Sequence, residues 1–135
     1  MKTVVADASA IVEYLLRTEA AAAIGPIVKD PETDVHVPGL CDVEVAASIR
    51  RALLQRRITV ERAEEAVMDY LDLPLIRHGH ERLMASILRR RANFSAYDAA
   101  YVTLAEALSA RFLSADRGLL RATRRHTKVR SASGG

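Results

Sequence analysis

The stretch Thr3-Val4-Val5-Ala6-Asp7-Ala8-Ser9-Ala10-Ile11, near the start of the chain, decides the fold. Its first half is a short run rich in β-branched residues, which is typical of a buried strand, and the run ends at the carboxylate of Asp7. From Ser9 onward the apolar residues take the spacing of a helix. A buried strand followed at once by a helix begins a βαβ unit, and it places Asp7 at the carboxyl end of the strand.

The same alternation continues along the chain. Further strands are predicted at 35–38, 73–76 and 111–115, with a possible last strand at 128–130. Helices are predicted at 19–28, 40–57, 60–71, 80–91, 96–110 and 118–123. On the helix at 40–57 the predicted apolar stripe consists of Val43, Ala46, Ala47, Leu53 and Leu54. We therefore expect a three-layer α/β fold, in which a mostly parallel central sheet of four to five strands is flanked by helices.

Length and composition are those of one folded domain, since the chain has 135 residues of which 50% are hydrophobic and 27% charged. We expect the domain to span residues 1–130 and the tail at 131–135 to be mobile. The lone Cys41 permits neither an internal disulfide nor a cysteine-based zinc site. No apolar run approaches the ~20 residues of a membrane helix, and Asp7 interrupts the place of a signal peptide's apolar stretch. These features predict a cytoplasmic protein without membrane association.

Charge is divided unevenly between the two halves of the chain. Residues 1–76 hold 8 Lys and Arg against 13 Asp and Glu, whereas residues 77–135 hold 12 against 4. Most of the cations are arginines, whose planar guanidinium binds phosphate through two parallel hydrogen bonds. The basic half therefore predicts a polyanionic partner, although a solvated, arginine-rich surface explains the composition equally well.

Four carboxylates fall at or near predicted strand ends. Asp7 and Asp116 follow the first and fourth strands, Asp98 lies in the first turn of the helix before the fourth strand, and Glu44 lies early in the helix after the second. Singly, each has an ordinary explanation as a helix cap or a solvated side chain. Ligands of parallel α/β sheets bind outside the carboxyl ends of the strands, however, so all four acids could face one crevice. Gathered carboxylates repel unless cations bind, and oxygen ligands alone suit Mg²⁺ or Mn²⁺.

The four acids stand in motifs that resemble those of the PIN-domain family, most closely the VapC-type toxins of bacterial type II toxin–antitoxin modules. The motifs are Val5-Ala6-Asp7-Ala8-Ser9-Ala10-Ile11, Pro38-Gly39-Leu40 followed by Glu44, Ser95-Ala96-Tyr97-Asp98-Ala99, and Phe112-Leu113-Ser114-Ala115-Asp116. They follow the family's order and spacing from residue 2 to about residue 130. The chain departs from the family at Ala47, where Asn is frequent, and at Ser114, where Thr is frequent.

The resemblance implies a Mg²⁺-dependent endoribonuclease, with Mn²⁺ as a possible substitute, that hydrolyses RNA phosphodiester bonds. Its catalytic metal ligands would be Asp7, Glu44, Asp98 and Asp116, supported by the hydroxyls of Ser9 and Ser114. It also implies a cognate VapB-like antitoxin, which would insert a cationic side chain into the acidic site, and a homodimer of the toxin.

RNA contacts are expected from arginines near these motifs, namely Arg89, Arg90, Arg91, Arg121, Arg124 and Arg125. Two other functions stay open: a PIN-domain nuclease of RNA processing that is not a toxin, and a catalytically silent RNA-binding protein. A receiver domain is excluded because Ala6 and Ala8 flank Asp7 where a second acid is required. A haloacid-dehalogenase phosphatase is excluded because Ser9 takes the place of its second aspartate.

Overall fold

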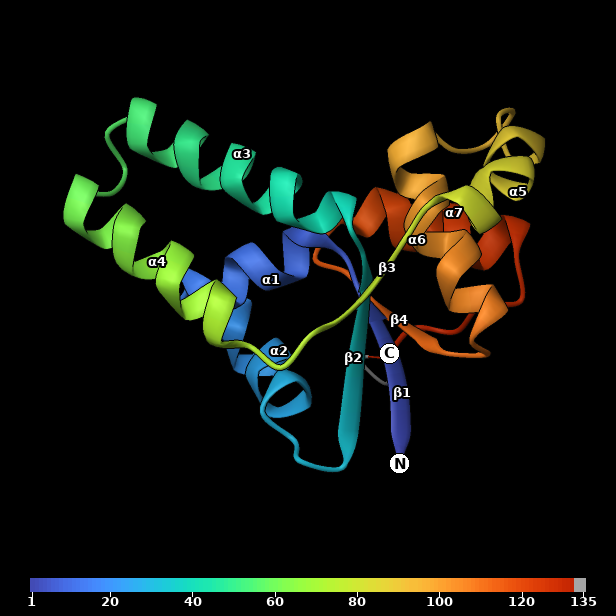
Figure 1. Cartoon of the computed structure of the whole chain (residues 1–135), viewed down its shortest axis with the longest axis horizontal. Coiled ribbons are helices and arrows are strands. Elements are labelled where there is room, and N and C mark those ends of the chain that lie inside the picture. The colour runs from blue at the N-terminus through green and yellow to red at the C-terminus, as the bar shows by residue number, and fades with distance from the viewer. Residues whose placement is uncertain (133–135) are drawn as a thin grey trace.

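A computed structural model describes residues 1–132 and has the predicted three-layer α/β architecture (Figure 1). Its strands are β1 (Lys2–Ala6), β2 (Thr33–Pro38), β3 (Ile76–His78) and β4 (Arg111–Leu113). They form one sheet in the order β3-β2-β1-β4, and every neighbouring pair is parallel. The predicted parallel sheet is therefore confirmed, with four strands in the described part of the chain.

Helices cover both faces of this sheet. Those on one side are α1 (Ala8–Leu15), α2 (Ala21–Val28), α3 (Leu40–Leu54) and α4 (Val60–Asp72), and those on the other are α5 (Met84–Arg89), α6 (Ala96–Ala107) and α7 (Arg117–His126) (Figure 1). A short 3₁₀ helix, η1 (Glu81–Leu83), precedes α5. α3 and α4 form a long antiparallel pair that projects from the sheet. No helix within residues 1–132 is both long and apolar enough to span a bilayer.

The strand order reverses at β1. The chain adds β2 and β3 on one side of β1 and then crosses over to add β4 on the other. Val5 of β1 accordingly pairs with His36 of β2 and with Phe112 of β4. The Asp7 N–H donates to the Leu113 carbonyl at 3.0 Å, which holds the carboxyl ends of the two strands together. Such a reversal opens a crevice at the carboxyl edge of the sheet, and Asp7 lies there.

The core holds α6 rigidly against the sheet. Every residue from 99 to 105 is buried, and α6 contacts β1, β2 and β4. Its first turn begins at Ser95, whose Oγ accepts the Asp98 N–H at 3.1 Å. The position of Asp98 is therefore fixed both by burial of the helix that follows it and by a side-chain cap.

The predicted apolar stripe of the helix at 40–57 is wrong. α3 instead buries Cys41, Val45, Ile49 and Ala52, whereas Val43 and Leu54 are 72% and 63% exposed. The buried set follows the i, i+4, i+8, i+11 spacing of one helix face. This face packs on α1, α4 and β2. Of the predicted stripe, Leu53 is partly buried against the core, whereas Val43 and Leu54 lie on the outward side.

Two predicted strands also differ. The third strand lies later than 73–76 because pairing requires Pro38 to face His78; there the Gly39 N–H donates to the His78 carbonyl at 2.8 Å, and His36 Nδ1 lies 2.8 Å from His78 Nε2. It is an edge strand, as predicted. The possible strand at 128–130 does not form.

The segment after α7 is instead joined to β4 by an isolated bridge between Phe112 and Ser131. The Phe112 N–H donates to the Arg130 carbonyl at 2.8 Å, and the Ala132 N–H donates to the Phe112 carbonyl at 2.9 Å. These bonds attach the start of the predicted tail to the sheet. The rest of that tail, at 133–135, lies outside the described residues.

Helix ends also depart from prediction where the backbone turns left-handed. α3 ends at Leu54 rather than at residue 57, with Arg56 at φ 58°, and α6 ends at Ala107 rather than at residue 110, with Ser109 at φ 51°. The helix predicted at 80–91 is divided into η1 and α5, and the one predicted at 118–123 extends over all of α7.

Arg90 tests how α5 is attached to α6. Its Nε donates to Thr103 Oγ1 at 3.1 Å, and Nη2 pairs with Glu106 at 2.9 Å. Because Thr103 is buried, we expect Arg90→Ala to lower the free energy of unfolding by about 1–2 kcal/mol, mainly through the lost hydrogen bond. Urea unfolding measures this loss. The neighbouring Arg89→Ala, which removes only a contact within α5, is the control; equal losses in both variants would contradict the assigned role.

Candidate functional site

A cavity of about 270 Å³ opens at the carboxyl edge of the sheet. All four predicted carboxylates line it, brought there by different elements: Asp7 follows β1, Glu44 comes from α3, Asp98 from α6, and Asp116 precedes α7. The remaining lining residues are Ala8, Ser9, Ala47, Ser48, Arg51 and Tyr101. The structure therefore brings the predicted acids together, while their roles as ligands and catalysts stay predictions.

Asp7 is the most tightly held of the four. It is only 5% exposed, and its Oδ1 accepts the Ser9 hydroxyl at 2.7 Å and the Ala10 N–H at 3.0 Å. Its Oδ2 accepts the Ser114 hydroxyl at 2.6 Å. A carboxylate offers about four acceptor positions, so Asp7 keeps one, on Oδ2, for a further partner in the cavity.

The two predicted supporting serines form a bridge between the first and fourth strands. Ser9 Oγ accepts the Ala115 N–H at 3.0 Å, and Ser114 Oγ accepts the Asp116 N–H at 3.0 Å. The two hydroxyls lie 3.3 Å apart. Both serines therefore orient Asp7 and the backbone leading to Asp116, and their support of a bound metal stays a prediction.

Helix capping and a place in the cavity prove compatible. Asp7 caps α1 through the Ala10 N–H, and Asp116 caps α7 through the Leu119 N–H at 3.0 Å. In each case the first turn of the helix fixes one carboxylate oxygen, because N-terminal N–H groups lack partners within the helix. Asp116 is exposed, and its second oxygen has no hydrogen bond within residues 1–132.

Glu44 is held by a residue that the sequence did not single out. The Tyr101 hydroxyl, from the buried part of α6, donates to Glu44 Oε1 at 2.6 Å. This bond crosses from one helical layer to the other at the edge of the sheet. It therefore fixes α3 relative to α6 at the point where their acids meet.

Burial, together with neighbouring carboxylates, raises the pKa values of Asp7, Asp98 and Glu44. Burial raises the pKa of Asp7, the hydrogen bonds from Ser114, Ser9 and Ala10 oppose the increase, and the charge of Asp116 adds to it. Burial also raises the pKa of Asp98, with a further increase from Asp116 and an opposing bond from Ser95.

Glu44 follows the same pattern. Its pKa is raised by burial, lowered by the Tyr101 bond, and raised again by Asp98. Ionisation of all three groups at once is therefore unfavourable, and a bound cation would stabilise their ionised forms.

These residues fit a divalent metal ion by their donor chemistry. The cavity offers carboxylate and hydroxyl oxygens without thiol or imidazole, and its acids repel one another, a combination that favours Mg²⁺ or Mn²⁺ over zinc. Within residues 1–132, no three Asp, Glu, His or Cys side chains already stand in ligating positions. Asp7 is fixed by its three bonds, so ligation would require the more exposed Asp98, Asp116 and Glu44 to move toward it.

Arg51 is the charged residue that sequence reasoning missed. It lies in α3 two helical turns after Glu44, and it contributes the cation to an otherwise acidic lining. No ion pair among residues 1–132 involves it. The seven-residue spacing from Glu44, which returns to the same helix face, was the available signal.

The predicted RNA-contacting arginines divide into three groups. Arg90 is engaged with Thr103 and Glu106, so its guanidinium serves the fold. Arg121 and Arg124 line a second hollow beside α7. Arg89, Arg91 and Arg125 are exposed and border neither the carboxylate cavity nor that hollow. Nucleic-acid contact by any of the six stays a prediction.

Neutralising Asp98 tests whether burial and the neighbouring carboxylates disfavour its ionised form. Asp7, Glu44 and Asp98 each have a folded-state pKa above the ordinary value of 3.8 for Asp or 4.5 for Glu. Below the ordinary pKa these groups do not lower the free energy of unfolding. As the pH rises through the higher folded-state pKa, that free energy decreases. In EDTA at neutral pH we therefore expect Asp98→Asn to raise Tm by about 2–4 °C, with the gain shrinking near pH 4. Exposed Glu64→Gln is the control. A lower Tm for Asp98→Asn would contradict the repulsion.

Comparison with known proteins agrees with this geometry. The PIN domain model matches residues 4–125. The chain is 35% identical over 113 residues to ribonuclease VapC12 of Mycobacterium tuberculosis (84% of this chain, 86% of the relative), and 34% identical over 120 residues to ribonuclease VapC3 of the same species (88% and 86%).

Solved structures share the fold. PAE2754 of Pyrobaculum aerophilum superposes with a TM-score of 0.70 at 19% identity, covering 96% of this chain and 83% of its own. VapBC2 of Rickettsia felis, bound to a promoter DNA fragment, gives 0.59 at 9% identity, covering 89% and 92%. At these low identities the solved structures show only a shared fold, whereas the domain match and the sequence relatives establish the family. The chain belongs to the PIN-domain family and is a relative of the VapC ribonucleases.

Proposed function

We propose that this protein is a metal-dependent endoribonuclease, the VapC-like toxin of a type II toxin–antitoxin module. The observation that carries the proposal is the convergence of four carboxylates, from four separate elements, on one cavity at the strand-order reversal. Its supports are the PIN-domain match and the ribonuclease names of the sequence relatives. We expect the substrate to be RNA and the bond broken to be a phosphodiester.

Asp7, Asp98, Asp116 and Glu44 would hold one or two Mg²⁺ or Mn²⁺ ions. Such an ion supplies Lewis-acid polarisation of the phosphodiester and lowers the pKa of bound water. Asp7 is the anchor because its hydrogen bonds leave it little freedom. Asp98, Asp116 and Glu44 keep free carboxylate oxygens, and one of them would orient the attacking water.

Arg51 complements the acids. A guanidinium binds phosphate oxygens in a planar, two-bonded geometry. From α3 it faces the same cavity as the carboxylates, so it is placed to hold the scissile phosphate beside them. We therefore assign Arg51 to substrate phosphate binding within the site.

The partner we propose is a VapB-like antitoxin. The uncompensated carboxylates would accept a cationic side chain from it, in the place of metal or RNA. Val43 and Leu54, exposed on the helix that carries Glu44, offer apolar area for its amphipathic helix. We further expect the toxin to form a homodimer.

The two alternatives make different predictions for cells. A housekeeping PIN nuclease would be harmless when expressed alone, and a silent RNA-binding protein would show no metal-dependent cleavage. Expression with and without the neighbouring small gene, followed by growth measurement, separates a toxin from the former. Metal-dependent cleavage of RNA separates a nuclease from the latter.

Cleavage assays test the ligands. We expect purified protein to cut RNA with Mg²⁺ or Mn²⁺ and to lose activity in EDTA. Asp7→Asn and Asp98→Asn keep the side-chain size but remove a charged ligand, and each should lower the single-turnover rate by about two orders of magnitude or more. Gel-resolved products measure the rate, and Glu64→Gln is again the control. Near-normal, metal-dependent cleavage by either Asn variant would refute the assigned site.

A second assay isolates Arg51. Arg51→Gln should lower kcat/KM by about 10- to 100-fold, because a phosphate contact is lost, while Mn²⁺ affinity measured by calorimetry should not weaken. The adjacent Arg50→Gln removes the same charge from a position outside the cavity and should cleave normally. Equal rates for the two variants would show that Arg51 makes no contact with the reacting phosphate.

A further inference from the structure

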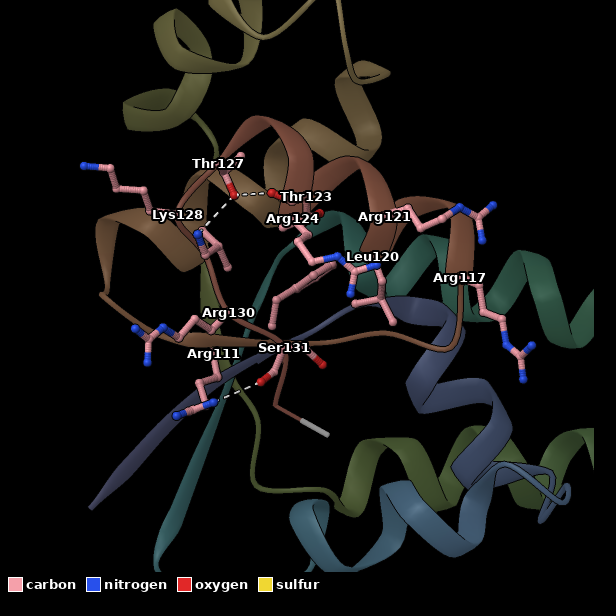
Figure 2. A pocket seen from close by; sticks show the side chains of 12 residues that line it. Arg111, Arg117, Leu120, Arg121, Thr123, Arg124, Thr127, Lys128, Arg130 and Ser131 are labelled. Carbon is pink, nitrogen blue, oxygen red and sulfur yellow. Dashed lines mark hydrogen bonds between the residues drawn. The ribbon is translucent and has the colours of Figure 1, made fainter. Parts of the chain in front are cut away.

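A second and larger hollow lies on the basic side of the molecule. It has a volume of about 720 Å³ and is enclosed by α7, β4 and the segment that follows α7. Figure 2 shows the cationic side chains around it, which come from β4, from α7 and from the segment after α7. Those that line it are Arg111, Arg117, Arg121, Arg124, Lys128 and Arg130. Below, this hollow is called the α7 groove.

The cations of the α7 groove make few contacts with the rest of the fold. All six are exposed, and none of them takes part in an ion pair among residues 1–132. Among residues 1–132, Arg111 Nη1 donates to the Ser131 carbonyl at 3.1 Å, which ties β4 to the segment after α7. Glu106 lines a neighbouring hollow with Arg111, Lys128 and Arg130, but no carboxylate among residues 1–132 forms a direct ion pair with the six cations.

Helix stability does not account for the arrangement. Arg117, Arg121 and Arg124 repeat at i, i+4 and i+7 along one face of α7, so like charges are neighbours there. α7 itself contains no acidic residue. Arg117 also lies in the first turn, where the helix dipole disfavours a cation. Arg124 lies in the last turn, where the dipole favours a cation. The like-charge spacing and the position of Arg117 each cost only tenths of a kcal/mol, but helix stability gains nothing from them, so a ligand is the better explanation for these charges.

The walls of the groove combine charge with apolar surface. Leu120 and Val129 are half-buried between the cations. The turn after α7 is held by Thr127, whose Oγ1 donates to the Thr123 carbonyl at 2.7 Å and accepts the Val129 N–H at 3.1 Å (Figure 2). A cationic groove with an apolar lining suits single-stranded nucleic acid, because phosphates meet the cations while sugars and bases lie on the apolar part.

The groove borders the carboxylate cavity at the start of α7. Asp116 lines the cavity and Arg117 lines the groove. A Cβ placed on Gly118 would lie 3.3 Å from Asp116 Oδ1 and 3.7 Å from Arg121 Nη2. The carboxylate of one site and the guanidinium of the other therefore flank the same glycine, and a single strand could cross from one to the other at this point.

We propose that the α7 groove is a second binding site for substrate RNA, which holds the backbone phosphates of the strand beyond the bond being cleaved. This inference rests on the proposed ribonuclease function for its choice of ligand. It assigns roles to Arg111 and Arg117, which the sequence did not single out, and to Lys128 and Arg130. It also separates Arg121 and Arg124, inside the groove, from Arg125, outside it.

The test measures RNA binding without cleavage. All proteins carry Asp98→Asn and are kept in EDTA, and the probe is a fluorescein-labelled single-stranded RNA of about 20 nucleotides, longer than the ~4–16 that such grooves hold. The groove variant is Arg121→Ala/Arg124→Ala. The control is Arg50→Ala/Arg82→Ala, which removes the same charge from two exposed arginines outside both the groove and the carboxylate cavity.

We expect the groove variant to bind about 10-fold more weakly. Its slope of log affinity against log salt should become shallower by about 1.4, or about 0.7 for each lost phosphate contact. The control should keep the parent affinity within about 2-fold and the parent slope. Circular dichroism melting checks that both fold, and Lys128→Ala, which lies outside any helix, gives an independent reading with a loss of one contact.

Equal losses in groove variant and control would overturn the proposal, because binding would then depend on net charge alone. Unchanged RNA affinity with loss of a co-expressed antitoxin would also overturn it and would make the groove a protein-binding site. Loss of RNA binding specific to the groove variant would support it even if the unmutated chain cut no RNA with any metal. In that case the nuclease proposal would fail and the groove would stand.

Discussion

The buried carboxylate of Asp7 is the constraint on which the rest of this structure depends. It lies at the point where the strand order reverses, and its hydrogen bonds join the end of β1 to α1 and to the segment after β4. An ionised group at 5% exposure is costly unless it is bonded. The hydroxyls of Ser9 and Ser114 stabilise it by donating hydrogen bonds. The same hydroxyls accept the N–H groups of Ala115 and Asp116, which fixes the backbone at Asp116. One side chain thus organises both the sheet edge and the cavity.

Charge is sorted around this point. Acids converge on the cavity from four parts of the chain, with Arg51 as the cation among them. Arg117, which directly follows Asp116, already belongs to the α7 groove. The acidic site suits metal ions and the basic groove suits phosphates, and a polyanion bound across both would experience attraction on each side of the reacting bond. Net charge alone, at +3, conceals this separation.

Much of this arrangement could be predicted from the sequence. Short buried strands followed by Asp7 and Asp116 were evident because apolar runs and the acids after them are local features, although β4 ends at Leu113 rather than at residue 115. The buried face of α3 could not be predicted in the same way. Apolar residues such as Val43 and Val45 lie on different sides of this helix, and only tertiary packing determines which side is buried. The register of β3 likewise depends on pairing with Pro38. The bond from Tyr101 to Glu44 joins residues 57 positions apart, and no local pattern indicates it.

The most direct test of the metal site is a crystal structure of the protein soaked in Mn²⁺, with anomalous scattering used to locate the metal. The account predicts an anomalous peak in the cavity, within ligating distance of Asp7 Oδ2 and of at least one carboxylate among Asp98, Asp116 and Glu44. A crystal in which Mn²⁺ saturates other sites but leaves no peak among these four side chains would contradict it.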